Sequence, residues 1–147
     1  MHLAHLRLRD FRNYHRLDAD FSPGIHLLLG QNAQGKTNLL EAVYLMSTLR
    51  SFRGVGSAQL ARHGKGGWFV GGRVVGTGTH DIRMAWSRTE RRLQLNQQPV
   101  KKLTDYLGTM RTVVFCTEDL HLVKGSGRIR RRFMDLLLSQ TQPGYLP

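Results

Sequence analysis

Hydrophobic and polar residues alternate at the start of the chain with the period of a half-buried β-strand. Leu3, Leu6 and Leu8 indicate a first strand, residues 10–14 interrupt it, and alternation resumes from Leu17 to Phe21. The residues Ser22-Pro23-Gly24 are typical of a turn. The short apolar run that follows, Ile25 to Leu29, predicts a buried strand.

From Asn38 the hydrophobic period becomes helical. Glu41 lies near the start of this helix, where a carboxylate suits the positive end of the helix dipole. The predicted apolar face consists of Leu39, Leu40, Val43, Tyr44 and Ser47.

The middle third predicts a small antiparallel sheet. Residues 68–75 form one strand, a turn at 77–80 follows, and Ile82, Met84 and Trp86 alternate along the return strand. A further hairpin joins residues 91–95 to residues 99–100 through Asn96-Gln97-Gln98.

Two helices and one strand are expected in the last third. Residues 103–107 predict a short helix ending at Gly108, and Val113 to Cys116 predict a second buried strand. A last helix is expected after 125–127, with Ser126 as a possible N-cap and an end at Pro143-Gly144. Its apolar stripe, expected to face the core, consists of Ile129, Phe133, Leu136 and Leu137.

Composition adds a strong positive charge to this pattern. The 147 residues carry 22 Lys and Arg against 10 Asp and Glu, a net charge of +12. Such an excess indicates a polyanion partner, with nucleic acid as the leading candidate. Simple solubility, or acidic partner segments outside this sequence, are the alternatives. The chain length suits one domain.

The single cysteine and the lack of a long apolar run bear on location. Cys116 has no second cysteine to pair with, lies in an apolar run and is expected in the core. No stretch of about 18 apolar residues indicates a membrane span, and the N-terminus lacks the apolar core of a signal peptide. We expect a cytoplasmic protein with no membrane partner.

The most specific motif is a phosphate-binding loop between the predicted strand at 25–29 and the helix after it. Gly30 and Gly35 allow close approach of the backbone, whose N–H groups form an anion nest at the helix N-terminus. Lys36 supplies a charge to the β- and γ-phosphates, and the Thr37 hydroxyl is placed to ligate Mg²⁺. The expected ATP-binding residues are Gly30, Gln31, Asn32, Ala33, Gln34, Gly35, Lys36, Thr37 and Asn38.

Acidic residues that could complete a hydrolytic site are poorly placed. Asp81 precedes a predicted strand, Glu118 and Asp119 follow the short strand at 113–116, and Asp135 lies within the last helix. We expect Glu118 and Asp119 to be loop or helix-start acids and Asp135 a surface or ion-pair residue. The catalytic residues stay unassigned.

Several segments together resemble the RecF family of SMC- and ABC-like ATPases. They are Asp10-Phe11-Arg12-Asn13-Tyr14, the phosphate loop, 48–53, 101–103, 114–120, 122–126 and 130–135. RecF chains often have a glycine where this chain has Gln97, and proline where it has Thr117. They are also longer, continuing through a helical arm to a signature motif and a Walker B strand. Residues 1–147 resemble their N-terminal ATP-binding lobe.

The resemblance implies an α/β P-loop NTPase fold, lobe I of an ABC/SMC-like head, with a flanking antiparallel β-subdomain. It places Arg12 and Asn13 beside the nucleotide and the loop from Glu118 near the γ-phosphate. It implies ATP and Mg²⁺ as cofactors, an ATP-dependent homodimer, and partnership with RecO and RecR in loading RecA at single-strand/duplex junctions of gapped DNA. DNA replication, repair of DNA damage and the SOS response are the processes implied. The longer protein would be a weak, DNA-dependent ATPase, whereas this part alone would bind ATP without hydrolysing it.

Basic clusters offer candidate DNA contacts. In the last helix Arg128, Arg131 and Arg132 are expected to project to one outer side and to contact phosphates. A solvated helix face, or an intramolecular acidic partner, is the alternative. The other clusters are Arg50 with Arg53, Arg88 with Arg91 and Arg92, and Lys101 with Lys102.

Two other functions stay open at this point. A stand-alone phosphotransferase such as a small kinase would need an acceptor-binding lid, and none is identifiable in the β-rich insertion. A basic nucleic-acid-binding module with a vestigial phosphate loop would bind no nucleotide.

Overall fold

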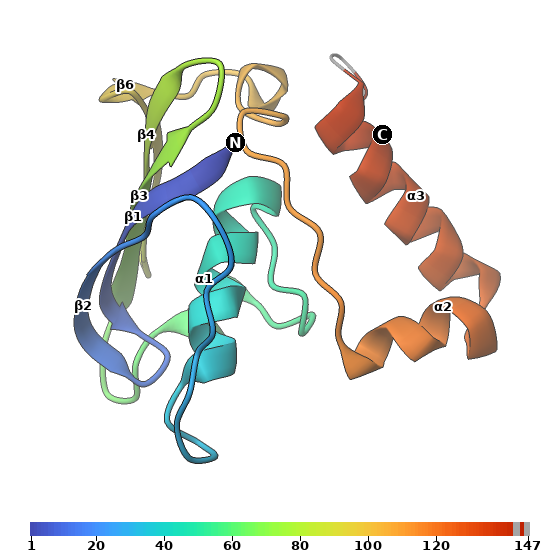
Figure 1. Ribbon diagram of the computed structural model, residues 1–147, viewed down its shortest axis with the longest axis horizontal. Helices are drawn as coiled ribbons and strands as arrows, with labels where there is room; N and C mark the ends of the chain where they lie inside the picture. Colours follow the sequence, from blue (N-terminus) through green and yellow to red (C-terminus); the bar gives the residue numbers. More distant parts are fainter. Residues whose placement is uncertain (143–144, 146–147) are drawn as a thin grey trace.

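The computed structural model describes residues 1–142 and 145, so the expected helix end at Pro143-Gly144 lies outside the described residues. A six-stranded antiparallel sheet, with the strand order β2-β1-β3-β4-β5-β6, packs against α1 on one face (Figure 1). After the sheet, an extended segment leads to α2 and α3. The strands are β1 His2–Phe11, β2 Tyr14–Asp20, β3 Gly67–Val75, β4 Thr79–Ser87, β5 Arg91–Leu95 and β6 Gln98–Pro99. The helices are α1 Lys36–Thr48, α2 Leu120–Lys124 and α3 Gly127–Thr141, with 3₁₀ turns at Ser57–Leu60, Leu103–Asp105 and Thr117–Asp119.

The predicted hairpins are confirmed, and they join into one sheet. β1 pairs with β2 through the turn at 12–13 and also with β3, so that Leu8 lies opposite Val70. The middle third is therefore continuous with the first hairpin. The short helix expected at 103–107 is a 3₁₀ turn, Leu103–Asp105.

The core lies between the sheet and α1. Leu6, Leu8 and Val70 from the sheet meet Ala42 and Met46 from the helix, all fully buried. The helix approaches closely at Gly72, where an added Cβ would lie 2.6 Å from the Met46 Cε. Because glycine has no side chain, α1 can pack close to the sheet at this position.

The predicted apolar face of α1 is partly confirmed, because Ser47 is buried and Leu39 and Val43 pack against the core, but the most buried face is shifted from it. The buried residues are Glu41, Ala42, Leu45, Met46, Ser47 and Thr48. Leu40 is 51% exposed, and Val43 and Tyr44 are only partly buried. Glu41 also lies beyond the first helical turn, which contains no acidic residue, so its expected role at the helix dipole is wrong. Because the buried face contains the acidic residue Glu41, the hydrophobic pattern of the sequence indicated a different face of the helix.

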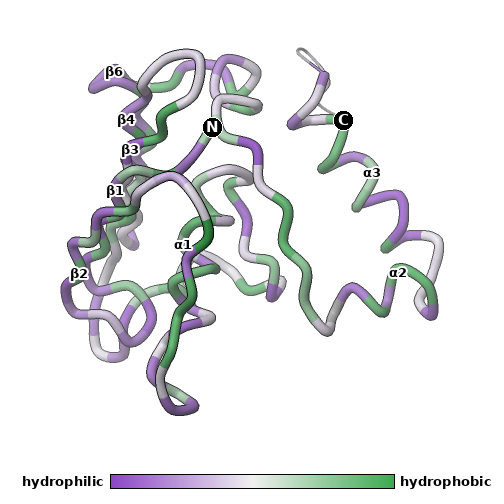
Figure 2. Tube along the Cα trace, viewed as in Figure 1, coloured by the Kyte–Doolittle hydropathy of each residue, from purple (hydrophilic) through white to green (hydrophobic). Residues whose placement is uncertain are grey.

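The two predicted buried strands are also wrong. Residues 25–29 and 113–116 are extended but belong to no strand, and Figure 2 shows how apolar these exposed segments are. The exposed fractions of Ile25 and Phe115 are 101% and 94%. Strands require neighbours that pair with their backbone N–H and C=O groups, and no described strand runs beside either segment.

Tyr106 and Gln140 attach the C-terminal segment to the body. The fully buried Tyr106 hydroxyl donates to the Met46 carbonyl of α1, and burial raises the pKa of Tyr106 well above its usual value. The Gln140 Oε1 accepts the Thr112 N–H at 3.0 Å. The apolar stripe of α3 is not core, because Phe133 is 45% exposed. Cys116, expected in the core, is only partly buried.

The turn between β5 and β6 predicts a stabilising substitution. Asn96 and Gln97 have φ values of 51° and 68°, the left-handed conformation of a type I′ hairpin turn. Asparagine tolerates this conformation, whereas glutamine is strained by about 1–2 kcal/mol. We expect Gln97→Gly to raise the free energy of unfolding by about 0.5–1 kcal/mol, because glycine loses part of the gain as chain entropy. Urea denaturation measures it. Gln94→Gly, within β5, is the matched control and should destabilise, and a loss from both substitutions would contradict the turn assignment.

Candidate functional site

The phosphate loop follows an exposed extended segment and ends at the first residue of α1. Gly30, Ala33 and Gly35 have φ values of 147°, 67° and 100°. Gly35 is the N-cap of α1, and no side chain caps the backbone N–H groups of the first helical turn. The first backbone N–H groups of a helix are therefore left for a ligand, at the positive end of the helix dipole.

The backbone angles of both loop glycines favour glycine, and polar side chains lie close to each of them. A Cβ at Gly30 would lie 2.5 Å from the Gln34 Oε1, and a Cβ at Gly35 would lie 2.5 Å from both amide atoms of Asn13. The loop is thus folded tightly around its own backbone, with the β1–β2 turn against it.

Lys36 folds back onto the loop. Its Nζ donates to the carbonyl oxygens of Gly30 at 2.7 Å and of Gln31 at 2.6 Å. These carbonyls hold the ammonium group over the curve of the loop, where it is available to a phosphate. Thr37 is exposed, so its hydroxyl is accessible to a metal ion.

The turn between β1 and β2 packs beside the loop. The Asn13 Nδ2 donates to the Gln34 carbonyl at 3.1 Å, and the Tyr14 hydroxyl donates to the Gly35 carbonyl at 3.2 Å. Partial burial raises the pKa of Tyr14, so the hydroxyl stays protonated and can donate. The structure therefore brings Asn13 against the loop from a distant part of the sequence.

Arg12 points to α1 instead of the loop backbone. Its Nε and Nη2 donate to the two carboxylate oxygens of Glu41, each at 2.8 Å, and Glu41 is fully buried. Its Nη1 donates to the Gln59 carbonyl at 3.0 Å. Sequence reasoning missed Glu41 as a partner of Arg12. A carboxylate adjacent to the buried positions 42, 45 and 46 is the signal that could have found it.

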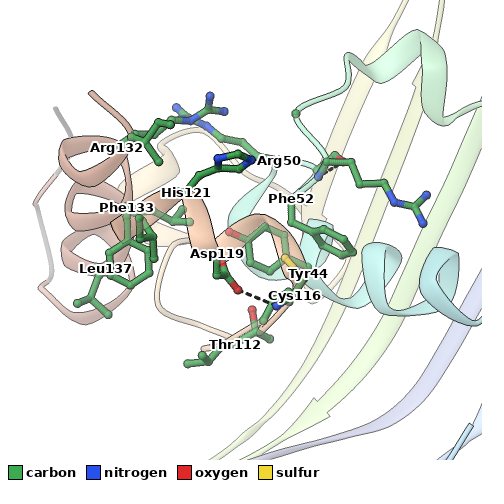
Figure 3. Close-up of a pocket in the computed structure, with 18 of the residues that line it drawn as sticks. Tyr44, Arg50, Phe52, Thr112, Cys116, Asp119, His121, Arg132, Phe133 and Leu137 are labelled. Atoms are coloured by element: carbon green, nitrogen blue, oxygen red, sulfur yellow. Dashed lines mark hydrogen bonds between the residues drawn. The ribbon is translucent and has the colours of Figure 1, made fainter. Parts of the chain in front are cut away.

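A cavity of about 530 Å³ lies between the body and α2–α3 (Figure 3). Phe133 and Leu137 line its apolar wall, and Arg50, Arg132 and His121 lie at its edge. Arg132, predicted to project outward with Arg128 and Arg131, is exposed as they are and also lines this cavity. Arg128 and Arg131 are exposed.

The candidate acids have other partners. Asp81 lies within β4, not before it, and accepts the Arg83 Nε at 2.7 Å. The Asp119 carboxylate accepts the Cys116 N–H at 2.7 Å, and Asp135 accepts the Tyr145 hydroxyl at 2.9 Å. The side chain of Glu118 lies outside the described part of the structure.

The described residues contain neither a cluster of metal-binding side chains nor a membrane-spanning helix. Within this part of the chain, no three His, Cys, Asp or Glu side chains gather in a way that could hold a metal ion. None of the helices traced there has the length and apolar content needed to span a membrane.

Known proteins resemble this chain in sequence over almost its whole length. The family described as an AAA domain matches residues 5–102, which include the phosphate loop. "DNA replication and repair protein RecF" from Listeria welshimeri is 43% identical over 147 residues, covering 99% of this chain and 40% of that protein. RecF from Lacticaseibacillus casei is 42% identical with the same coverage. The chain thus spans about 40% of the length of the curated relatives it matches.

Solved structures show the same relationship. "Structure of the recombination mediator protein RecF-ATP in RecFOR pathway" superposes with a TM-score of 0.91 at 31% identity, covering 98% of this chain and 40% of that chain. A structure described as "Structural biochemistry of ATP-driven dimerization and DNA stimulated activation of SMC ATPases" superposes with a TM-score of 0.71 at 17% identity, covering 93% of this chain and 99% of that chain. The second likeness shows the fold alone, that of an SMC ATPase head.

The expected α/β P-loop NTPase fold is therefore confirmed, with the antiparallel sheet as its β-subdomain. The chain belongs to the AAA-domain family and, within it, to the RecF proteins, with whose amino-terminal part it aligns.

Proposed function

We propose that residues 30–38 bind the triphosphate of ATP together with Mg²⁺. The observation that carries the proposal is the glycine-bounded loop that opens onto the uncapped first turn of α1. Backbone N–H groups at such a helix start bind phosphate without further side chains. A RecF relative of the same fold has a structure described as "RecF-ATP".

Individual side chains have distinct roles in this proposal. Lys36 exchanges its two loop carbonyls for the β- and γ-phosphates. The exposed Thr37 hydroxyl ligates Mg²⁺, which neutralises phosphate charge. Asn13 stays against the loop, and Arg12 adds positive charge one residue away.

We further propose that this chain forms the ATP-binding lobe of a RecF-like replication and repair protein. Its net charge of +12 supports DNA as partner, with Arg128 and Arg131 as exposed contacts and Arg132 at the edge of the cavity. ATP would control DNA binding at single-strand/duplex junctions through dimerisation, and RecO and RecR would be the partners in loading RecA. ATP hydrolysis would need acidic residues from the remaining length of the relatives, since the described acids here are paired elsewhere.

Titration of the chain with ATP and Mg²⁺ in a calorimeter tests the nucleotide site. We expect Lys36→Ala to weaken ATP binding about a hundredfold or more, because two charge-assisted hydrogen bonds to phosphate are lost. Its melting temperature should stay within a few degrees of the original, since the Lys36 side chain bonds only to loop carbonyls.

Lys65→Ala is the matched control, because Lys65 is an exposed lysine on another loop. It should bind ATP as the unchanged chain does. Equal affinities of Lys36→Ala and the unchanged chain would overturn the proposed site.

A further inference from the structure

A closed ring of hydrogen bonds connects the β1–β2 turn, α1 and the loop after α1. Arg12 binds both oxygens of Glu41, and the Arg53 Nη1 lies 3.4 Å from Oε2, the oxygen that also accepts the Arg12 Nε. The same Arg53 nitrogen donates to the Asn38 Oδ1 at 2.8 Å. The Asn38 Nδ2 donates to the Asn13 Oδ1 at 2.8 Å, and the backbone between Asn13 and Arg12 closes the ring.

The ring touches the phosphate loop directly. The Asn13 Nδ2 donates to the Gln34 carbonyl, and Asn38 belongs to the first turn of α1. Arg53 is therefore connected to the loop through the amides of Asn38 and Asn13, and Arg12 through the backbone and the amide of Asn13. Arg12 itself has a φ of 52°, a backbone conformation that needs support from its surroundings.

Glu41 is the interior anchor of this arrangement. It is 0% exposed, whereas the side chains of Arg12 and Arg53 are 18% and 33% exposed. A carboxylate is retained at such depth only when its oxygens are fully hydrogen-bonded. Here the Ser51 hydroxyl supplies a further donor, at 2.5 Å from the Glu41 Oε1.

The two arginines keep donors to spare. A guanidinium group has five N–H donors, and Arg12 directs one from each nitrogen to Glu41 and Gln59. Arg53 uses Nη1 alone, so its Nε and Nη2 have no hydrogen-bond partner among residues 1–142. One carboxylate beside two guanidinium groups leaves one net positive charge.

We propose that Glu41 is a positioning residue for nucleotide binding, whose buried carboxylate holds Arg12 and Arg53 beside the phosphate loop with donors free for phosphate. The inference rests on the proposed function of the loop and adds a residue that never touches the ligand. Without the carboxylate the guanidinium groups of Arg12 and Arg53 repel each other, and the Asn13 amide is displaced from the Gln34 carbonyl of the loop.

Ser51→Ala is the mildest variant that tests this role. It removes one hydrogen bond from the Glu41 carboxylate, and we expect ATP binding about three- to tenfold weaker. Ser47→Ala is the matched control, because Ser47 is a buried serine nearby whose hydroxyl bonds to Tyr44 and Thr112 instead. It should lose similar stability but keep its ATP affinity within about twofold.

A double-mutant cycle between Glu41 and Arg53 gives a second readout. We expect Glu41→Gln and Arg53→Gln each to weaken ATP binding about tenfold. The double variant should bind ATP no more weakly than the weaker-binding of the two single variants. A merely structural role would instead give ATP affinities that follow only the folded fraction, measured by thermal melting. If Glu41→Gln does not fold, the comparison of Ser51→Ala with Ser47→Ala still decides.

The two proposals fail in distinguishable ways. Loss of ATP binding in Lys36→Ala with unchanged affinity in Ser51→Ala, or with additive effects in the cycle, would overturn the role of Glu41 alone. Equal binding by Lys36→Ala and the unchanged chain would overturn the nucleotide site itself, and the role of Glu41 with it.

Discussion

Replacing Phe11 by alanine is expected to lower the free energy of unfolding by about 3–5 kcal/mol. Phe11 is fully buried at the end of β1, and its ring meets the edge of the Trp68 ring with centroids 5.8 Å apart. The substitution removes the transfer energy of the ring and leaves a cavity that the sheet fills only in part. Urea denaturation followed by tryptophan fluorescence measures the loss.

Phe115→Ala is the control for this prediction. Phe115 is the same residue type but 94% exposed, so its removal should change the unfolding free energy by less than about 0.5 kcal/mol. Similar losses for Phe11→Ala and Phe115→Ala would mean that residues 113–116 are packed in solution.

Arg12→Ala should be the most damaging polar substitution, with a loss of about 3–5 kcal/mol. It leaves the Glu41 carboxylate fully buried without its bidentate partner, and an uncompensated interior charge is costly. The measurement is again the unfolding free energy in urea.

Arg16→Ala serves as the matched comparison, because Arg16 makes an ion pair with Asp18 at 3.4 Å while its side chain is 70% exposed. Such surface pairs contribute about 0–1 kcal/mol. A loss in Arg12→Ala no larger than in Arg16→Ala would show that Arg53 and Ser51 together satisfy Glu41.

The hairpins of the sheet were predictable because their signals are local, whereas the pairing of β1 with the distant β3 was not predicted. β3 and β4 alternate over adjacent residues around a polar turn, and Asn96 with Gln97 closes the next hairpin. The motif of the proposed phosphate loop is local in the same way, since Gly30, Gly35, Lys36 and Thr37 all lie within residues 30–37. In both cases, the residues that determine the structure lie within a few positions of each other.

The failures have one physical cause, dependence on distant partners. The run Ile25 to Leu29 has the composition of a buried strand, but only a neighbouring strand could bury it. The orientation of α1 depends on Glu41, whose partner Arg12 lies 29 positions away. The cations Arg50 and Arg132 share one cavity edge although most of the chain separates them.

The exposed segments 25–29 and 113–116 bear on how RecF chains are made. A ribosome that synthesises such a chain releases this amino-terminal part first, and the remaining 60% of the relatives' length follows over tens of seconds, at roughly 5–20 residues per second. During that interval the side chains of Ile25, Leu27, Leu29, Val113 and Phe115 face the solvent. We therefore expect these segments of a nascent RecF chain to bind chaperones that recognise short apolar sequences.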